Sequence, residues 1–149
     1  MTASQRDPDR FVCLVCEDVR AEVGGKLTVL GFMPGDTINV PPGILNPQLN
    51  LTFVFVFNKA EGEFTGSFSL TGPIGIVGAE IPIPTAHVEP DTGMVSVFQF
   101  KPTPQIPLGR YVAKVTLNGR SYEQKILLRA APVPLTATAS ATTTGSFKH

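Results

Sequence analysis

The most regular feature of the sequence is an alternation of apolar and polar residues with a period of two. Apolar side chains occupy every second position of residues 49–57: Leu49, Leu51, Phe53, Phe55 and Phe57. Successive side chains of a strand point to opposite faces, so this pattern predicts a strand with an aromatic face in the core. Residues 63–71 repeat the pattern, and residues 58–62 (NKAEG) provide the turn between the two strands.

A turn at Asn118-Gly119 predicts the clearest hairpin of the chain. Both residues readily adopt the positive φ angles that a two-residue type I′ turn requires. Counting outward from this turn gives the register: Leu117 opposite Arg120, Thr116 opposite Ser121, Val115 opposite Tyr122, Lys114 opposite Glu123, and Tyr111 opposite Ile126. This register collects apolar residues on one face and polar residues on the other, which supports the prediction.

A second hairpin is predicted around Gly24-Gly25. A two-residue loop would mix polar and apolar residues on each face, so we favour the three-residue loop Val23-Gly24-Gly25. The resulting register pairs Glu22 with Lys26, Arg20 with Thr28 and Val19 with Val29. The polar face then carries Asp18, Arg20, Glu22, Lys26 and Thr28, and the other face carries Val19, Ala21, Leu27 and Val29.

Further strands are predicted at 37–40, 76–83 and 94–100, while recurring proline and glycine leave no room for a long amphipathic helix. Pro82 and Pro84 make 76–83 an edge strand. For 94–100 the pattern does not show which face is inward. The sequence therefore predicts an all-β fold, an antiparallel immunoglobulin-like Greek-key β-sandwich of about eight strands. Tyr111 fits either the tyrosine corner of such folds or an ordinary core position.

Length and charge limit the domain count and the kinds of partner. The chain has 149 residues, with 12 Lys and Arg against 12 Asp and Glu. We expect one β-sandwich domain at 10–129, a flexible N-terminus at 1–9 and an Ala/Thr-rich, low-complexity tail at 130–149. A balanced charge argues against nucleic-acid binding. No membrane span or secretory signal is visible, so we expect a cytoplasmic protein that binds neither nucleic acid nor membrane.

The two cysteines form a C-x-x-C spacing at Cys13 and Cys16. In an extended strand their side chains point to opposite faces, and their Cα atoms lie about 10 Å apart, beyond the reach of a disulfide. Neither a second ligand pair nor a nearby helix start suggests a metal or redox site. We expect buried, reduced thiols.

The segment from Cys16 to Phe32 (CEDVRAEVGGKLTVLGF) resembles the opening hairpin of an uncharacterised family of short bacterial β-sandwich proteins. Members of that family begin with an acidic-Asp-Val-Arg-x-Glu hairpin closed by Gly-Lys, and finish with a Gly-x-Tyr strand and an Asn-Gly-like turn. The resemblance covers about residues 10–129. It implies an immunoglobulin-like fold, a bacterial or phage-related origin and no assigned activity.

Two groups of residues are candidates for an interaction surface. Asp18, Arg20 and Glu22 share one strand face with Lys26, where Arg20 could bridge both carboxylates; the alternative is a solvated ion ladder of little energetic value. Val54 and Val56 lie on the polar side of the Phe53 strand and, with Leu127, could form an exposed apolar patch. Loops or the tail could instead cover them.

Two alternatives involve chemistry near residues 87–93. Asp91-Thr92-Gly93 matches the triplet of aspartic proteases, which would make a hydrolase using Asp91, although the same residues form ordinary turns. His87, Glu89 and Asp91 alternate and could present metal or small-ligand contacts, but Pro90 interrupts them. We therefore expect no enzyme, no cofactor and no metal.

The sequence-based prediction is a non-catalytic structural or protein-interaction module that self-associates or binds a protein partner. Its expected contact elements are the polar hairpin from Asp18 to Lys26 and the tail at 130–149. The hydrolase and the ligand- or metal-binding module are the alternatives.

Overall fold

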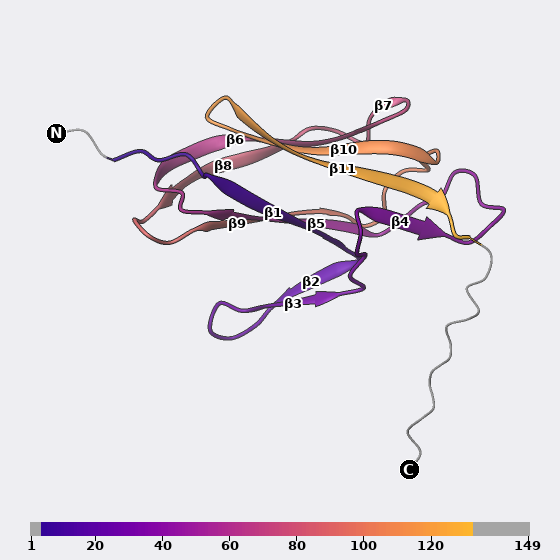
Figure 1. The fold of residues 1–149 in the computed structure, drawn as a ribbon, viewed down its shortest axis with the longest axis horizontal. Helices are drawn as coiled ribbons and strands as arrows, with labels where there is room; N and C mark the ends of the chain where they lie inside the picture. The colour runs from indigo at the N-terminus through magenta and orange to yellow at the C-terminus, as the bar shows by residue number, and fades with distance from the viewer. Residues whose placement is uncertain (1–3, 133–149) are drawn as a thin grey trace, which may run out of the picture.

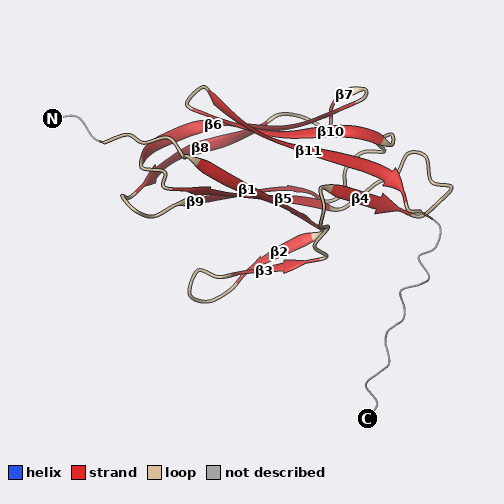
Figure 2. Cartoon of the chain, in the orientation of Figure 1, coloured by secondary structure: helices blue, strands red, loops and turns tan. Residues whose placement is uncertain are grey.

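The computed structural model describes residues 4–132, and these residues form strands and turns without a helix (Figure 2). The strands are β1 (Arg10–Cys16), β2 (Asp18–Ala21), β3 (Leu27–Leu30), β4 (Thr37–Val40), β5 (Leu51–Asn58), β6 (Gly62–Gly72), β7 (Gly75–Ile76), β8 (Ile81–Val88), β9 (Met94–Phe100), β10 (Gly109–Leu117) and β11 (Arg120–Ala130). The all-β prediction is confirmed. The described residues form eleven strands, whereas about eight were predicted.

Two sheets lie one above the other, with a small hairpin beneath them (Figure 1). One sheet is antiparallel and has the order β1-β5-β9. The larger sheet has the order β4-β11-β10-β6, and both β7 and β8 pair with β6. It is mixed, because β4 runs parallel to β11. The β2–β3 hairpin forms a separate two-stranded sheet.

Aromatic rings join the two layers. Phe53, Phe55 and Phe57 project from β5 into the core with no exposed surface. From the opposite layer, Phe68 of β6 stacks on Phe98 of β9, with ring centroids 4.3 Å apart and planes inclined by 6°. Large rings bury much apolar area at low conformational cost, so the alternating phenylalanines of β5 both define the strand and hold the layers together.

Both predicted hairpin registers are confirmed. Leu117 lies opposite Arg120 and Tyr111 opposite Ile126, with positive φ at Asn118 and Gly119. In the first hairpin Arg20 lies opposite Thr28, and the Glu22 N–H donates to the Lys26 carbonyl at 2.7 Å. Turn chemistry and face alternation together determine these registers.

The strand predicted at 76–83 is misplaced. Residues 75–76 form the short β7, and the next strand, β8, begins at Ile81 and continues through both prolines to Val88. Pro82 and Pro84 are tolerated because β8 is an edge strand that pairs only with β6. The edge character was predicted correctly, whereas the proline positions suggested the end of a strand that in fact contains them.

Tyr111 is buried, and its hydroxyl donates to the carbonyl of Pro107, four residues upstream. A tyrosine near the start of a strand with this hydrogen bond is the arrangement called the tyrosine corner. Tyr111 is therefore both a buried core residue and part of a tyrosine corner, the two interpretations that the sequence left open. Before the first strand, Arg6 pairs with Glu61 through two backbone hydrogen bonds of 2.8 and 3.0 Å.

Candidate functional site

The outer face of the β1-β5-β9 sheet is aliphatic. Two successive rows of residues run across its three strands, with Val12 opposite Val56 and Val56 opposite Val95 in one row. The other row consists of Leu14, Val54 and Val97. Directly paired residues of neighbouring strands share a face, so all six side chains point away from the phenylalanine core. We call these six residues the aliphatic face.

Solvent reaches the margins of the aliphatic face. Val12 and Val95 are each 52% exposed and Val97 is 37% exposed, while Val54 at the centre is 2% exposed. Polar residues bound the face at both ends, with Arg10 and Asn58 beyond one row and Thr52 and Gln99 beyond the other.

The outer face of the larger sheet is different in character. Its central strand β10 places Lys114 between Glu123 of β11 and Ser69 of β6. The next row along places Thr116 between Ser121 and Ser67. This is the usual surface of an antiparallel sheet that contacts water on one side. The aliphatic face therefore departs from the pattern that the same molecule follows in its other layer.

The predicted patch of Val54, Val56 and Leu127 requires correction. Val54 is buried and Val56 is half-buried; β1 and β9 flank both residues, and β2 of the hairpin contacts β5. Leu127 belongs to β11 in the other layer and takes no part. The exposed members of the face are Val12, Val95 and Val97, which sequence reasoning missed. A signal was present, since β1 and β9 are apolar at both odd and even positions.

The β2–β3 hairpin is fixed to the end of the aliphatic face through Asp18. Its carboxylate Oδ1 lies 2.7 Å from Lys101 Nζ and accepts a hydrogen bond from Gln99 Nε2 at 3.0 Å. The hydrogen bond with Lys101 is the main reason why the pKa of Asp18 lies below its usual value. The Thr52 hydroxyl adds a bond to the Glu17 carbonyl at 3.2 Å. The hairpin is therefore joined to the sheet at its base.

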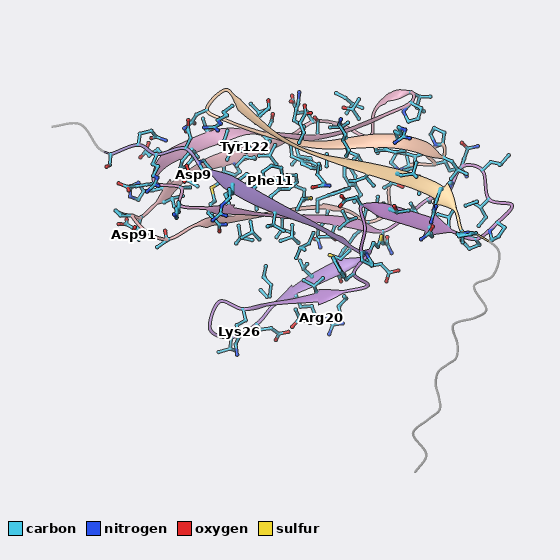
Figure 3. The ribbon with its side chains drawn as sticks, viewed as in Figure 1. Asp9, Phe11, Arg20, Lys26, Asp91 and Tyr122 are labelled. Atoms are coloured by element: carbon cyan, nitrogen blue, oxygen red, sulfur yellow. The ribbon has the colours of Figure 1, made fainter. Side chains whose placement is uncertain are left out.

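Beyond this base the hairpin side chains are open to solvent. Figure 3 shows Arg20 and Lys26 on the projecting hairpin, away from the two layers. Glu22 accepts a bond from the Thr28 hydroxyl at 2.7 Å. The possible bridge from Arg20 to both carboxylates is absent from the described part of the chain, because Asp18 turns toward Lys101 instead. Asp18, Arg20, Glu22 and Lys26 thus do not form one network.

Cys13 and Cys16 are free thiols on opposite faces of β1. Cys13 lies opposite Phe55 on the core side, and burial raises its pKa to about 12. Cys16 is fully buried at the end of the aliphatic face, and burial is the largest cause of its raised pKa. A thiol with a raised pKa is a poor nucleophile and a poor metal ligand at neutral pH.

Asp91 lies in the turn between β8 and β9, at one end of the molecule (Figure 3), and His87 is the penultimate residue of β8. Asp91 is exposed and has φ of 62°, a conformation that suits a turn. His87 Nε2 lies 3.0 Å from Glu89 Oε2, and both side chains are more than half exposed. The structure therefore brings together two of the three predicted ligands, His87 and Glu89.

Residues 4–132 contain neither a cluster of metal-ligating side chains nor a membrane-spanning helix. No three His, Cys, Asp or Glu side chains in this range are placed to share a metal ion. The range also contains no helix that could cross a membrane.

Comparison with known proteins adds no further constraint. No protein-family model matches the sequence, and no curated protein is significantly similar to it. The resemblance of residues 10–129 to an uncharacterised bacterial family therefore stays a prediction. The tail predicted as a contact element lies outside the described residues from 133 onward.

Proposed function

We propose that this protein is a non-catalytic interaction module that self-associates through the aliphatic face. The observation that supports the proposal is the contrast between the two outer surfaces. One sheet presents charged and hydroxyl side chains, whereas the outer side of the other consists of six aliphatic ones in two rows, of which Val12, Val95 and Val97 are exposed. Contiguous apolar surface on a soluble protein is typical of a site that another surface covers.

Burial of the aliphatic face supplies a driving force for association. Full burial of a valine side chain contributes roughly 1.5–3 kcal/mol relative to exposure. Val12 and Val95 each retain about half of their surface, so each would contribute on the order of 1 kcal/mol when covered. A flat face of short side chains suits another flat surface better than a small ligand, which needs a concave site.

Charge around the aliphatic face favours a second copy as the partner. The hairpin carries Arg20 and Lys26 together with Glu22, and Arg10 stands at the far end of the face. Because both signs alternate at this rim and the formal net charge is 0, a surface of similar mixed charge is complementary to it. A strongly acidic or basic partner would meet like charges.

The proposal also includes a more detailed assignment of the fold than the all-β class. We propose an immunoglobulin-like Greek-key sandwich of the bacterial type, located in the cytoplasm. The two-layer packing and the hydrogen bond from Tyr111 to Pro107 support the immunoglobulin-like part. Neither the turn at Asp91 nor the exposed pair of His87 and Glu89 gives specific support to the hydrolase or the metal-binding alternative.

The test is the oligomeric state of a matched pair of variants. Val12→Lys places a charge on the aliphatic face, whereas Ile76→Lys places the same charge on β7, where the native side chain is 54% exposed. Light scattering after size exclusion should show a multimer for the wild type and Ile76→Lys, and a smaller species for Val12→Lys. A monomeric wild type at about 100 μM would overturn the proposal, since its binding free energy would then be weaker (less negative) than about −5.4 kcal/mol.

A further inference from the structure

Among the described strands, β9 has an open edge that lacks the features protecting the other sheet edges. It is the last strand of its sheet, pairing only with β5. Within residues 4–132 no other backbone group bonds to residues 94–100. Its sequence, MVSVFQF, contains neither a charge nor a proline. A strand of this composition with an open edge is a template for pairing with another strand.

The other sheet edges carry features that oppose such pairing. β8 contains Pro82 and Pro84, which lack the N–H that a ladder needs. β4 has four residues and β7 has two. β1 begins with the charged Arg10, and its Val15 carbonyl already accepts a bond from the Met33 N–H at 2.9 Å. β9 alone among the described edge strands is both long and unprotected.

The bond from Met33 to Val15 also shows which groups of β9 are free. Because the Val15 carbonyl points away from β5, its pair Phe53 must bond on the other side, toward β9. Phe53 pairs with Phe98, so Phe98 and Ser96 use their backbone groups within the sheet. By alternation, the N–H and C=O groups of Val95, Val97 and Gln99 point to the open edge.

A groove runs beside this edge and leaves it accessible. The groove has a volume of about 220 Å³ and lies between β8 and β9, lined by Ile81, Pro82, Ile83, Pro84, Ser96, Val97 and Phe98. The nearest strand of the opposite layer, β8, has prolines at this point. Because proline has no backbone N–H to donate, β8 is a poor hydrogen-bonding partner for the backbone of β9. An incoming strand would find hydrogen-bonding groups on one side and apolar side chains on the other.

We propose that β9 pairs with β9 of a second copy in an antiparallel, two-fold arrangement. This inference rests on the proposed self-association and adds a second contact to the aliphatic face, the neighbouring edge of β9. Antiparallel pairing of one strand with its own copy satisfies two-fold symmetry, because each residue exchanges the same hydrogen bonds with its partner. No like charges meet, since β9 carries none.

The pairing joins the aliphatic faces of the two copies. A three-stranded sheet becomes a six-stranded one, and Val95 and Val97 stand beside Val95 and Val97 of the second copy. Cross-strand pairs of β-branched residues stabilise a sheet. The free N–H and C=O groups of β9 belong to odd-numbered residues, so odd-numbered residues of one copy pair with odd-numbered residues of the other. The two-fold axis therefore lies at the position of one residue and not between two consecutive residues.

The first test removes one free N–H while leaving the ladder to β5 intact. Val97→Pro deletes the outward-facing N–H in the middle of β9, and Val97→Ala truncates the same side chain but keeps that N–H. We expect Val97→Pro to raise the dimer dissociation constant about tenfold or more relative to Val97→Ala, measured by sedimentation. Equal dissociation constants for the two variants, both folded by circular dichroism, would overturn the inference.

The second test does not depend on the folding of the proline variant. One cysteine is added to the native Cys13 and Cys16 by replacing Val95, Ser96, Val97 or Phe98, and each full-length variant is oxidised under mild conditions beside the wild type, which controls for the native thiols. A disulfide needs Cα atoms within about 7 Å, so the residue nearest the two-fold axis should cross-link most strongly. Val12→Cys, on the opposite edge of the sheet, should not cross-link. Efficient linkage through position 12 alone would overturn the inference.

These tests separate failure of the inference from failure of the proposed function. If Val12→Lys dissociates the multimer while Val97→Pro does not, the aliphatic face mediates association and β9 pairing is wrong. If removal of residues 133–149 abolishes association and no β9 cysteine cross-links, the tail occupies the site instead of a second β9. If the wild type is monomeric, both proposals fail.

Discussion

At the scale of single residues, the two faces of β1 place adjacent side chains in opposite surroundings. Val12 is 52% exposed on the aliphatic face, whereas Cys13 next to it points toward the phenylalanine core and pairs with Phe55. A thiol beside aromatic rings behaves as a small apolar group, and ionising it would place a charge in a region of low polarity. The chemistry of Cys13 is therefore governed by its burial.

This burial predicts a loss of stability at alkaline pH. The unfolded thiol ionises near pH 9, but in the folded protein the pKa of Cys13 is raised to about 12. Between these values the folded state holds a proton that the unfolded state has lost, so the free energy of unfolding falls by about 1.4 kcal/mol per pH unit from this group. Below pH 9 the contribution is fully present.

The measurement is urea unfolding of wild type and Cys13→Ala at pH 8, 9 and 10. Burial also raises the pKa values of Tyr111 and Tyr122, and these groups destabilise both proteins alike. The wild type should therefore lose stability more steeply than Cys13→Ala above pH 9. Parallel pH profiles would show that the Cys13 side chain becomes solvated before the protein unfolds.

At the scale of elements, the β2–β3 hairpin is attached at one end and free at the other. Asp18 connects its base to Lys101 and Gln99. At its tip, Val23 is 94% exposed, and Leu27 is exposed despite lying on the apolar face of the hairpin. A hairpin of two short strands is marginally stable by itself, so its attachment determines how often it opens.

Removal of the Asp18 carboxylate should therefore loosen the hairpin selectively. We expect Asp18→Ala to increase amide exchange of the β2–β3 strands about two- to fivefold, the range of an exposed ion pair, while exchange in β10 stays unchanged. Glu22→Ala is the control, because the Glu22 carboxylate accepts a hydrogen bond only from Thr28 of the same hairpin among the described residues. An equal effect of both substitutions would show that Asp18 does not hold the hairpin to the sheet.

The pH dependence of this attachment has the opposite sign to that of Cys13. The pKa of Asp18 is lowered from 3.8, mainly by its hydrogen bond with Lys101. The contribution of the ionised carboxylate is present above pH 3.8 and is lost as the pH falls through the lower, folded value. Exchange of the hairpin in the wild type should approach that of Asp18→Ala only in strong acid.

Element by element, the sequence predicts structure well where one face is polar. The Asn118-Gly119 and Gly24-Gly25 hairpins were assigned to the correct residue because a shift by one position would exchange polar and apolar faces. β9 could not be oriented, since Met94 and Phe98 on one face and Val95 and Val97 on the other are all apolar. The sequence predicts Val54 and Val56 of the candidate site, but its exposed members on β1 and β9 escape prediction because both strands are apolar on both faces.

At the scale of the whole molecule, the β1-β5-β9 sheet is apolar on both sides while the described chain covers only one side fully. Its inner side meets the larger sheet through aromatic rings, and its outer side is the aliphatic face. A sheet with two apolar faces is typical of the middle of three layers. The hairpin supplies part of a third layer, and a second copy that covers the aliphatic face would supply the rest.

This arrangement predicts that stability and association depend on different residues. Phe68 is fully buried between the layers and contacts the rings of Phe53, Phe55 and Phe98. Its truncation leaves a cavity that rigid neighbours on both sheets cannot fill, so Phe68→Ala should cost about 3–5 kcal/mol in urea unfolding. Phe32→Ala, at a side chain 53% exposed, should change stability by about 0.5 kcal/mol or less.

Variants of Phe68 also distinguish the effect of core packing from the effect on association. Because Phe68 lies on the side of the sheet opposite to the aliphatic face, the folded fraction of Phe68→Ala should retain the oligomeric state of the wild type. Phe68→Leu, which keeps more of the buried volume, provides the measurement if the alanine variant does not fold. A stable Phe68→Leu protein that is monomeric would show that the inner and outer faces of the sheet are coupled, and that the two layers do not act independently.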